Sequence, residues 1–163
     1  MSVDRDRMRP DRGFRLLATI AFIVLLSGCA GSGDSRLQCE TPTGRGPVLG
    51  SSFNLRYGER SKLAGEDLTL TFVQVLEESR CPVGVQCIWE GNARVGVNVE
   101  KPPSRSATLE LNTSRRYDTE ATYQGFRVQL LQVVPHPRQG HTLQAADYCA
   151  NLKIVRAQAA GES

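Results

Sequence analysis

Residues 67–100 read DLTLTFVQVLEESRCPVGVQCIWEGNARVGVNVE, and this stretch decides the fold. Apolar and polar residues alternate in DLTLTF, residues 67–72, and again in ARVGVNVE, residues 93–100. A period of two places alternate side chains on opposite faces of a β-strand, so each run predicts a strand with one apolar face. Proline, glycine and two cysteines fill the segment between them, which therefore reads as a constrained connection between two strands.

The same alternation recurs on both sides of this stretch. The further runs are SFNLRY (52–57), SATLELN (106–112), GFRVQL (125–130) and NLKI (151–154). Short alternating runs separated by turn residues are typical of an antiparallel all-β domain. Helical periodicity is absent apart from the segment 141–151, where a short helix would fit.

In two of the runs the apolar phase slips by one residue. The slips fall between Phe72 and Val73 and between Leu130 and Leu131. A slip of one residue moves the apolar set to the opposite face, as in a bulged strand that bends from one sheet into another. We therefore predict a single antiparallel β-sandwich, or a partly closed β-barrel, of about six to seven strands.

The N-terminus carries an export signal. Five arginines in residues 1–15 precede LLATIAFIVLL, residues 16–26, which contains no charge. This run is much shorter than the roughly 20 residues that a membrane-spanning helix needs, so a cleaved signal peptide is the better interpretation. The later residues hold fifteen Lys and Arg against fourteen Asp and Glu, a near balance that does not favour nucleic acid as a partner.

Leu26-Ser27-Gly28-Cys29 resembles the lipobox of bacterial lipoproteins. The resemblance implies that Cys29 carries a thioether-linked diacylglycerol, becomes the first residue of the mature chain and holds the protein on a membrane of the cell envelope. Ala30 resembles the second residue of lipoproteins sent to the outer membrane rather than kept at the inner one, in a host with two membranes. The predicted organisation is a signal peptide (1–28), a flexible tether (29–38), one β domain (39–157) and a disordered tail (158–163).

Four cysteines remain besides Cys29, and export to an oxidising compartment predicts two disulfides. Three pairings are open to four cysteines. Since Cys81 and Cys87 enclose only PVGVQ, we predict Cys81 with Cys87 and Cys39 with Cys149. The five-residue gap does not match a redox CxxC pair, and two histidines in a loop-like segment are weak evidence for zinc, so neither metal nor cofactor is predicted.

The segment from Ser79 to Asn92 has two interpretations. In the structural one, Pro82 and Gly91 shape the backbone, and Trp89 packs on the disulfide and the core because it lies two residues after Cys87. In the functional one, the disulfide stiffens an exposed binding loop. The candidate contact residues are then Arg80, Val83, Val85, Gln86 and Glu90.

The pattern SRCP-x4-C-x-W-x-G resembles a group of small exported bacterial proteins, often lipoproteins. GFRVQLLQVVPHP, residues 125–137, and Tyr148 also look like that group, so the resemblance runs from about Leu68 to Val155. It implies the fold and the compartment and says nothing of an activity.

No nucleophile with a base, no paired catalytic carboxylates and no phosphate-binding loop stand out in the sequence. We therefore expect a non-catalytic β domain that binds an envelope protein or another ligand, or serves a structural role, at the membrane. A periplasmic protease inhibitor that presents the disulfide-stiffened loop is the first alternative. A hydrolase whose site converges only in the fold is the second.

Overall fold

The computed structural model describes Cys39 and residues 46–158. The predicted signal peptide (1–28), the tether (29–38) and all but the first residue of the predicted tail fall outside this part of the chain.

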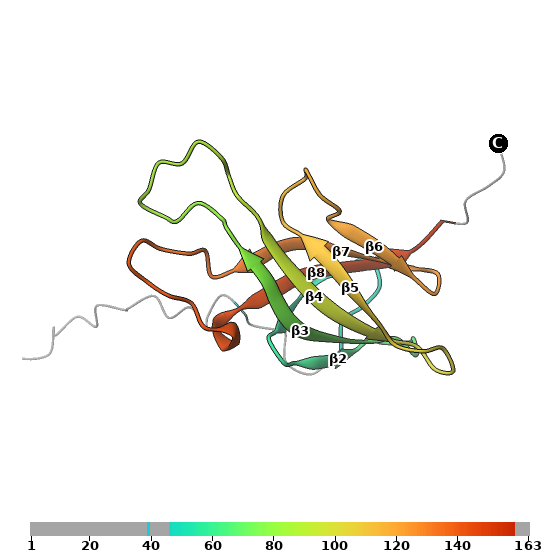
Figure 1. Ribbon diagram of the computed structural model, residues 1–163. Helices are drawn as coiled ribbons and strands as arrows, with labels where there is room; N and C mark the ends of the chain where they lie inside the picture. Colours follow the sequence, from blue (N-terminus) through green and yellow to red (C-terminus); the bar gives the residue numbers. More distant parts are fainter. Residues whose placement is uncertain (1–38, 40–45, 159–163) are drawn as a thin grey trace, which may run out of the picture. The chain divides into compact units, whose positions relative to one another are not determined.

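The domain is a β-sandwich of two four-stranded antiparallel sheets. One sheet has the order β1-β8-β7-β6 and the other β2-β3-β4-β5 (Figure 1). The strands are β1 (Ser52–Arg56), β2 (Arg60–Lys62), β3 (Thr69–Glu78), β4 (Ala93–Glu100), β5 (Ala107–Asn112), β6 (Glu120–Tyr123), β7 (Phe126–Val134) and β8 (Cys149–Arg156). The predicted sandwich is confirmed over its alternative, a partly closed barrel, because the described strands form two separate sheets.

All six alternating runs form strands, but two short strands were not predicted. They are β2, with the sequence RSK, and β6, with the sequence EATY. Each lies at the edge of its sheet, where a strand needs no apolar face and where charged side chains discourage pairing with another molecule. RSK contains no apolar residue, and EATY alternates over only four residues, a run that the sequence analysis did not single out. A short 3-10 helix at Ala145–Asp147 lies within the segment predicted to allow a helix.

Both phase slips correspond to irregularities in the strand pairing. The register of β3 with β4 shifts between Phe72 and Gln74, and that of β7 with β8 shifts between Leu130 and Gln132. The predicted bulges are thus confirmed, but each bulged strand stays in its own sheet, so the prediction that it passes from one sheet into the other was wrong. Beyond each bulge the apolar residues of the strand fall on its other face, while the strand itself stays in the same sheet.

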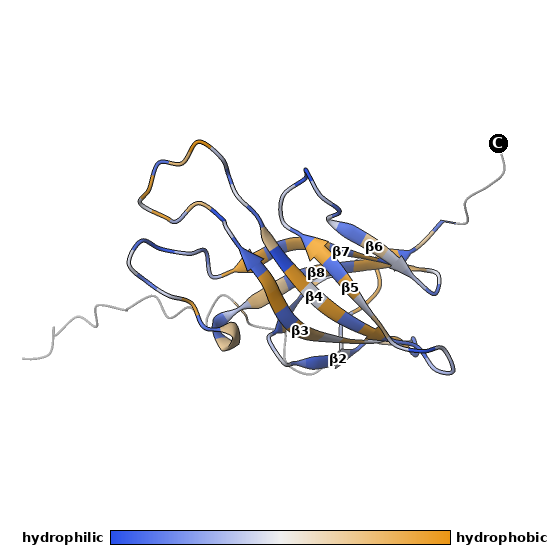
Figure 2. Ribbon diagram, in the orientation of Figure 1, coloured by the Kyte–Doolittle hydropathy of each residue, from blue (hydrophilic) through white to orange (hydrophobic). Residues whose placement is uncertain are grey.

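The core lies between the two sheets and is built from the inward-facing members of the alternating runs. Figure 2 shows the alternation as orange and blue segments along the strands. Tyr57, which directly follows β1, and Phe72 of β3 meet edge to face with ring centroids 5.6 Å apart. The fully buried side chains include Leu55, Leu70, Phe72, Val95, Val97, Val99, Phe126, Leu152 and Ile154.

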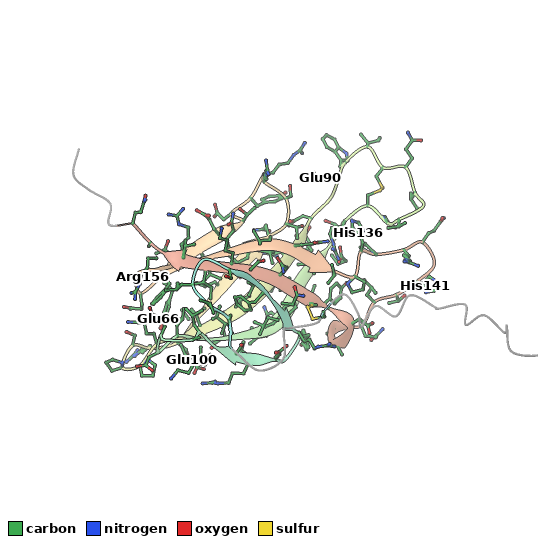
Figure 3. The ribbon with its side chains drawn as sticks, turned by 180° about the vertical axis from the view of Figure 1, so that it is seen from behind. Glu66, Glu90, Glu100, His136, His141 and Arg156 are labelled. Carbon is green, nitrogen blue, oxygen red and sulfur yellow. A yellow bond between two sulfur atoms is a disulfide. The ribbon has the colours of Figure 1, made fainter. Side chains whose placement is uncertain are left out.

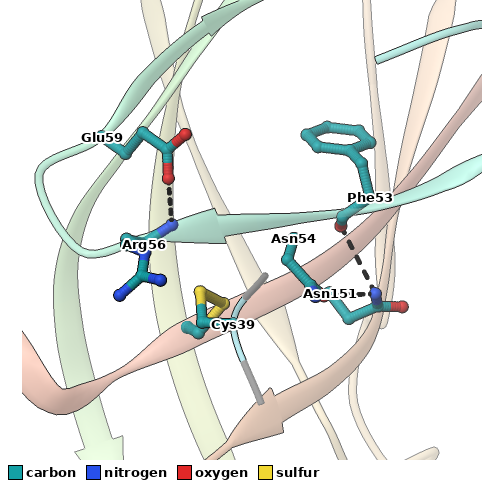
Figure 4. Close-up of a disulfide and its surroundings, with 7 residues drawn as sticks. Cys39, Phe53, Asn54, Arg56, Glu59 and Asn151 are labelled. Atoms are coloured by element: carbon teal, nitrogen blue, oxygen red, sulfur yellow. Dashed lines mark hydrogen bonds between the residues drawn. A yellow bond between two sulfur atoms is a disulfide. The ribbon is translucent and has the colours of Figure 1, made fainter. Parts of the chain in front are cut away.

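The disulfide Cys39–Cys149 ties the start of the described chain to β8, as predicted. Its Cα atoms are 5.8 Å apart, and both residues are buried. Cys149 pairs with Arg56 of β1, so the bond lies where β1 ends and β8 begins (Figure 4). This position places Cys39 at one particular end of the sandwich.

Candidate binding surface at the loop end

Three long loops lie at that same end of the sandwich, which we call the loop end. They join β3 to β4 (residues 79–92), β5 to β6 (113–119) and β7 to β8 (135–148). In Figure 3 the labelled Glu90, His136 and His141 lie at the loop end, and Glu66 and Arg156 lie at the opposite end. The segment singled out from the sequence is thus brought beside two others that no sequence pattern had linked to it.

The β3–β4 loop begins as a continuation of its hairpin. The backbone N–H of Ser79 donates to the carbonyl of Asn92 at 2.8 Å, and that of Cys81 donates to the carbonyl of Glu90 at 3.0 Å. These bonds extend the pairing of the two strands into the loop. The base of the loop therefore has the rigidity of a sheet.

Beyond this base the loop is closed by the predicted disulfide. Cys81 and Cys87 are bonded, with Cα atoms 5.9 Å apart. Pro82 is half-buried, and the N–H of Val83 donates to the carbonyl of Pro137 at 2.8 Å, which ties the loop to its β7–β8 neighbour. The tip is therefore held both by a covalent bond and by a second loop.

Gly91 is required where the loop rejoins the hairpin. Its φ is +72°, and a Cβ atom there would lie 1.9 Å from the carbonyl oxygen of Ser79. A side chain would meet both a backbone conformation that L-residues disfavour and a direct overlap. The structural role predicted for Gly91 is explained by this close approach.

We expect Gly91→Ala to lower the free energy of unfolding by about 2–4 kcal/mol, the sum of the left-handed conformation and the steric overlap. Gly84→Ala is the matched control, because Gly84 has a φ of +89° but no atom within 4 Å of its ideal Cβ position. That control should lose only about 1–2 kcal/mol. Urea denaturation of both variants measures the difference, and equal losses would contradict a role for the close approach.

Asn92 joins the β3–β4 loop to the β5–β6 loop. Its buried side-chain oxygen accepts hydrogen bonds from the backbone N–H of Thr113 (3.2 Å) and of Ser114 (3.1 Å). Its amide nitrogen donates to the side-chain oxygen of Asn112 at 2.8 Å. The Ser114 hydroxyl donates in turn to Glu90 at 2.8 Å. Sequence reasoning missed this network, because a lone Asn beside a glycine reads as a turn residue.

Arg80 was predicted to contact a partner, and this was wrong, because its side chain is only 7% exposed. The guanidinium forms an ion pair with Glu78 and donates to the carbonyls of Val133 and Pro135, the second at 3.0 Å. Val133 lies near the end of β7 and Pro135 just beyond it, and the arginine donates to the carbonyls of both. Arg80 therefore fastens the base of the β3–β4 loop to the β7–β8 loop instead of facing outward.

Tyr148 lies against the same ion pair. Burial, together with the charge of Glu78 and a hydrogen bond to it, raises the pKa of Tyr148 from 10.0 to about 12. A pKa above the unfolded value means that folding favours the neutral phenol. Its contribution to stability is complete below about pH 10 and is lost as the pH rises toward about 12.

We expect the stability difference between the wild type and Tyr148→Phe to shrink as the pH rises from about 10 to about 12. Phenylalanine fills the same space but has no proton to lose, so the variant removes one titration and little packing. Urea denaturation at a series of pH values measures both proteins. If the free energies of unfolding of the two proteins change in parallel across this range, the pKa of Tyr148 is not raised by folding.

Trp89 was predicted to pack on the disulfide and the core, and this was also wrong, because it is 65% exposed. The tip projects beyond the two sheets, and Cys87 itself is exposed. The face that Cys87 and Trp89 share is therefore not a core face. The Arg116 guanidinium carbon lies 5.0 Å from the centroid of the Trp89 ring. A cation over the indole holds it beside the β5–β6 loop without covering it.

The tip carries a concentration of exposed apolar side chains, which we call the tip cluster: Val83, Val85, Ile88 and Trp89. Ile88 is 91% exposed, the most of any large apolar residue in the described part of the chain. Figure 2 shows apolar colouring along this loop, outside both sheets. Gln86 and Glu90 are exposed as well, so four of the five predicted contact residues face solvent.

A polar groove adjoins the tip cluster. It encloses about 720 Å³ and connects to a smaller pocket of about 200 Å³ that Trp89 lines. Its walls include Glu77, Arg94, Glu110, Arg116 and Tyr117.

In this groove the Arg94 guanidinium bonds Glu110 at 3.1 Å, and its Nε stays 4.0 Å from Glu77. That Nε is buried and has no hydrogen-bond partner among the described residues. Such a donor can serve an oxygen of a bound ligand. The described residues contain no group of three or more His, Cys, Asp or Glu side chains able to hold a metal ion.

None of the helices in Cys39 and residues 46–158 is long and apolar enough to cross a membrane. No family model matches the chain, and comparisons with curated proteins and with solved structures found no match either.

Proposed function

We propose that this protein is a lipid-anchored, non-catalytic binding module of the cell envelope, and that the loop end is its contact surface. The observation that carries the proposal is the tip cluster, in which four large apolar side chains are exposed on one loop. Soluble domains rarely leave contiguous apolar side chains in water unless they serve a contact.

The rigidity of the loop supports the same conclusion. A disulfide, the Arg80 ion pair and the Asn92 network hold the loop before any partner arrives. A preorganised loop loses little conformational entropy on binding, so more of the contact energy becomes affinity. A loop that only connected two strands would need none of these restraints.

The anchor rests on the lipobox at Cys29 and the export signal before it. We expect Cys29→Ala to abolish incorporation of labelled palmitate and to release the protein from the membrane fraction, because lipid supplies the attachment. Wild-type protein in the same host is the reference. Unchanged labelling in the variant would sink the lipoprotein assignment.

Site-specific photo-crosslinking in the envelope of a diderm bacterium tests the contact surface. A crosslinker at Ile88 should give a discrete adduct, because this side chain is the most exposed of the tip cluster. Val48 is the matched control, since it is an apolar residue that is 51% exposed and precedes β1 at the opposite end of the sandwich. The same adducts at both positions, or no adduct with either protein or lipid at Ile88, would argue against a binding surface at the loop end.

Protease inhibition is a second candidate because the tip is exposed, apolar and closed by a disulfide. Loops of this kind can enter an active-site cleft with little loss of entropy. The measurement is the rate of substrate cleavage by exported serine and cysteine proteases with the protein in excess. Slowed cleavage that Ile88→Ser restores would support inhibition, and unchanged rates would exclude it for the proteases tested.

A further inference from the structure

We propose that the tip cluster contacts the lipid bilayer itself, namely the one that carries the Cys29 anchor. The inference rests on the proposed function, since it takes the lipid anchor and the loop end as given and names the partner.

Cys39 is fastened at the loop end. Its disulfide partner Cys149 immediately follows the β7–β8 loop and pairs with Val134 at the end of β7. The described chain leaves at the other end, where the N–H of Ala157 donates to the carbonyl of Gly125 in the β6–β7 turn. The tip cluster therefore lies at the same end of the domain as Cys39, where the segment from the proposed lipid anchor is attached.

Nine residues lie between Cys29 and Cys39, so the ten steps from one to the other span at most about 33–36 Å. Strand β8 alone has eight residues, or about 26 Å, between the loop end and the opposite end. A bilayer contact at the opposite end would require the connecting segment to run nearly extended along the whole domain. A contact at the loop end requires no such extension.

The chemistry of the two ends matches this orientation. The opposite end carries exposed ion pairs, among them Arg156 with Glu66 and Lys62 with Asp67. Figure 3 shows Glu66 and Arg156 there, away from Glu90. These charged groups would resist entry into a bilayer, whereas the tip cluster offers apolar side chains.

Trp89 has the properties of a residue at a membrane interface. Its indole combines an apolar body with an N–H, and tryptophan is enriched at the level of lipid headgroups. Arg116, stacked on the ring, would lie where phosphate oxygens accept hydrogen bonds. Ile88, the neighbouring residue, would reach further toward the acyl chains.

The charge of the loop end is close to balanced. The three loops contain Arg80, Arg115, Arg116 and Arg138 against Glu90, Asp118 and Asp147. Arg80 is neutralised by Glu78 below them. Attraction to anionic lipid is therefore small, and we expect the bilayer contact to depend on apolar burial and to change little with salt.

The test uses the only tryptophan of the chain, which is Trp89 itself. The lipidated full-length protein is reconstituted in vesicles of phosphatidylethanolamine and phosphatidylglycerol, with and without lipids brominated near the headgroup end of the acyl chains. We expect blue-shifted emission from Trp89 and strong quenching by the brominated lipid, at both low and high salt. Ile88→Ser should reduce the quenching, since Ile88 helps to draw the tip into the bilayer.

The matched control moves the reporter to the opposite end, as Trp89→Phe combined with Val48→Trp. Its single tryptophan should emit as in water and escape quenching. Equal quenching at the two positions, or none at Trp89, overturns the bilayer contact. If Trp89 is unquenched while the Ile88 crosslinker still gives a discrete protein adduct in cells, the proposed binding surface stands and only the bilayer assignment fails. If the crosslinker also fails, the proposed function falls with it.

Discussion

Replacing Arg80 by alanine is expected to lower the free energy of unfolding by about 3–5 kcal/mol. The variant leaves the Glu78 carboxylate, whose side chain is only 20% exposed, without its cation. It also strands the carbonyls of Val133 and Pro135, to which Arg80 donates. Removing one partner of a buried pair is costly because the remaining charge and carbonyls stay desolvated.

Arg127→Ala is the control for a general effect of removing arginine. Its ion pair with Glu120 is 3.4 Å long, and both side chains are more than one-third exposed. Exposed pairs of this kind contribute about 0–1 kcal/mol, so this variant should unfold close to the wild type. Urea denaturation compares the two.

Arg80→Lys adds a further check on the geometry. A lysine keeps the charge but not the planar array of donors that reaches Glu78 and two carbonyls together. We expect it to recover only part of the lost stability. An Arg80→Ala variant as stable as Arg127→Ala would mean that the guanidinium does not fasten the loop.

Most of the strands could be predicted from the sequence. Alternation of apolar and polar residues depends only on local pattern, and it placed six of the eight strands and both bulges. Strand β2 has three polar residues and β6 only four residues, so neither gave a run long enough to stand out, although Ala121 and Tyr123 of β6 pack against the core.

The loop end was harder to predict because its organisation depends on contacts between distant segments. Arg80 looked like a surface residue because its partners include carbonyls more than 50 positions away in the sequence. Trp89 looked like a core residue because tryptophan usually is, and no pattern revealed that the tip extends beyond the sheets. The disulfides were predictable because the short gap between Cys81 and Cys87 suggested that these two pair. Cys149 was then the remaining partner for Cys39.

The two disulfides should differ in what their loss affects. Replacing Cys39 and Cys149 together by alanine opens a loop with a sequence separation of 110, whereas Cys81 and Cys87 are separated by 6. In the chain-entropy model these bonds contribute about 4.8 and about 2.4 kcal/mol. Urea denaturation should therefore show the larger loss for Cys39→Ala with Cys149→Ala, and the reverse order would contradict the assignment.

The Cys39–Cys149 bond also determines where the segment from the proposed anchor first meets the domain. Without it, the first backbone contact in the described chain after Cys39 is at Pro47, whose carbonyl accepts from the N–H of Ala64 at 2.8 Å. That contact lies at the opposite end, before β1. We therefore expect Cys39→Ala with Cys149→Ala to weaken the quenching of Trp89 by brominated lipid, even under conditions where the domain stays folded. Cys81→Ala with Cys87→Ala keeps the point of attachment and disturbs only the tip. If quenching survives undiminished in folded Cys39→Ala with Cys149→Ala, the attachment at Cys39 does not orient the loop end toward the bilayer.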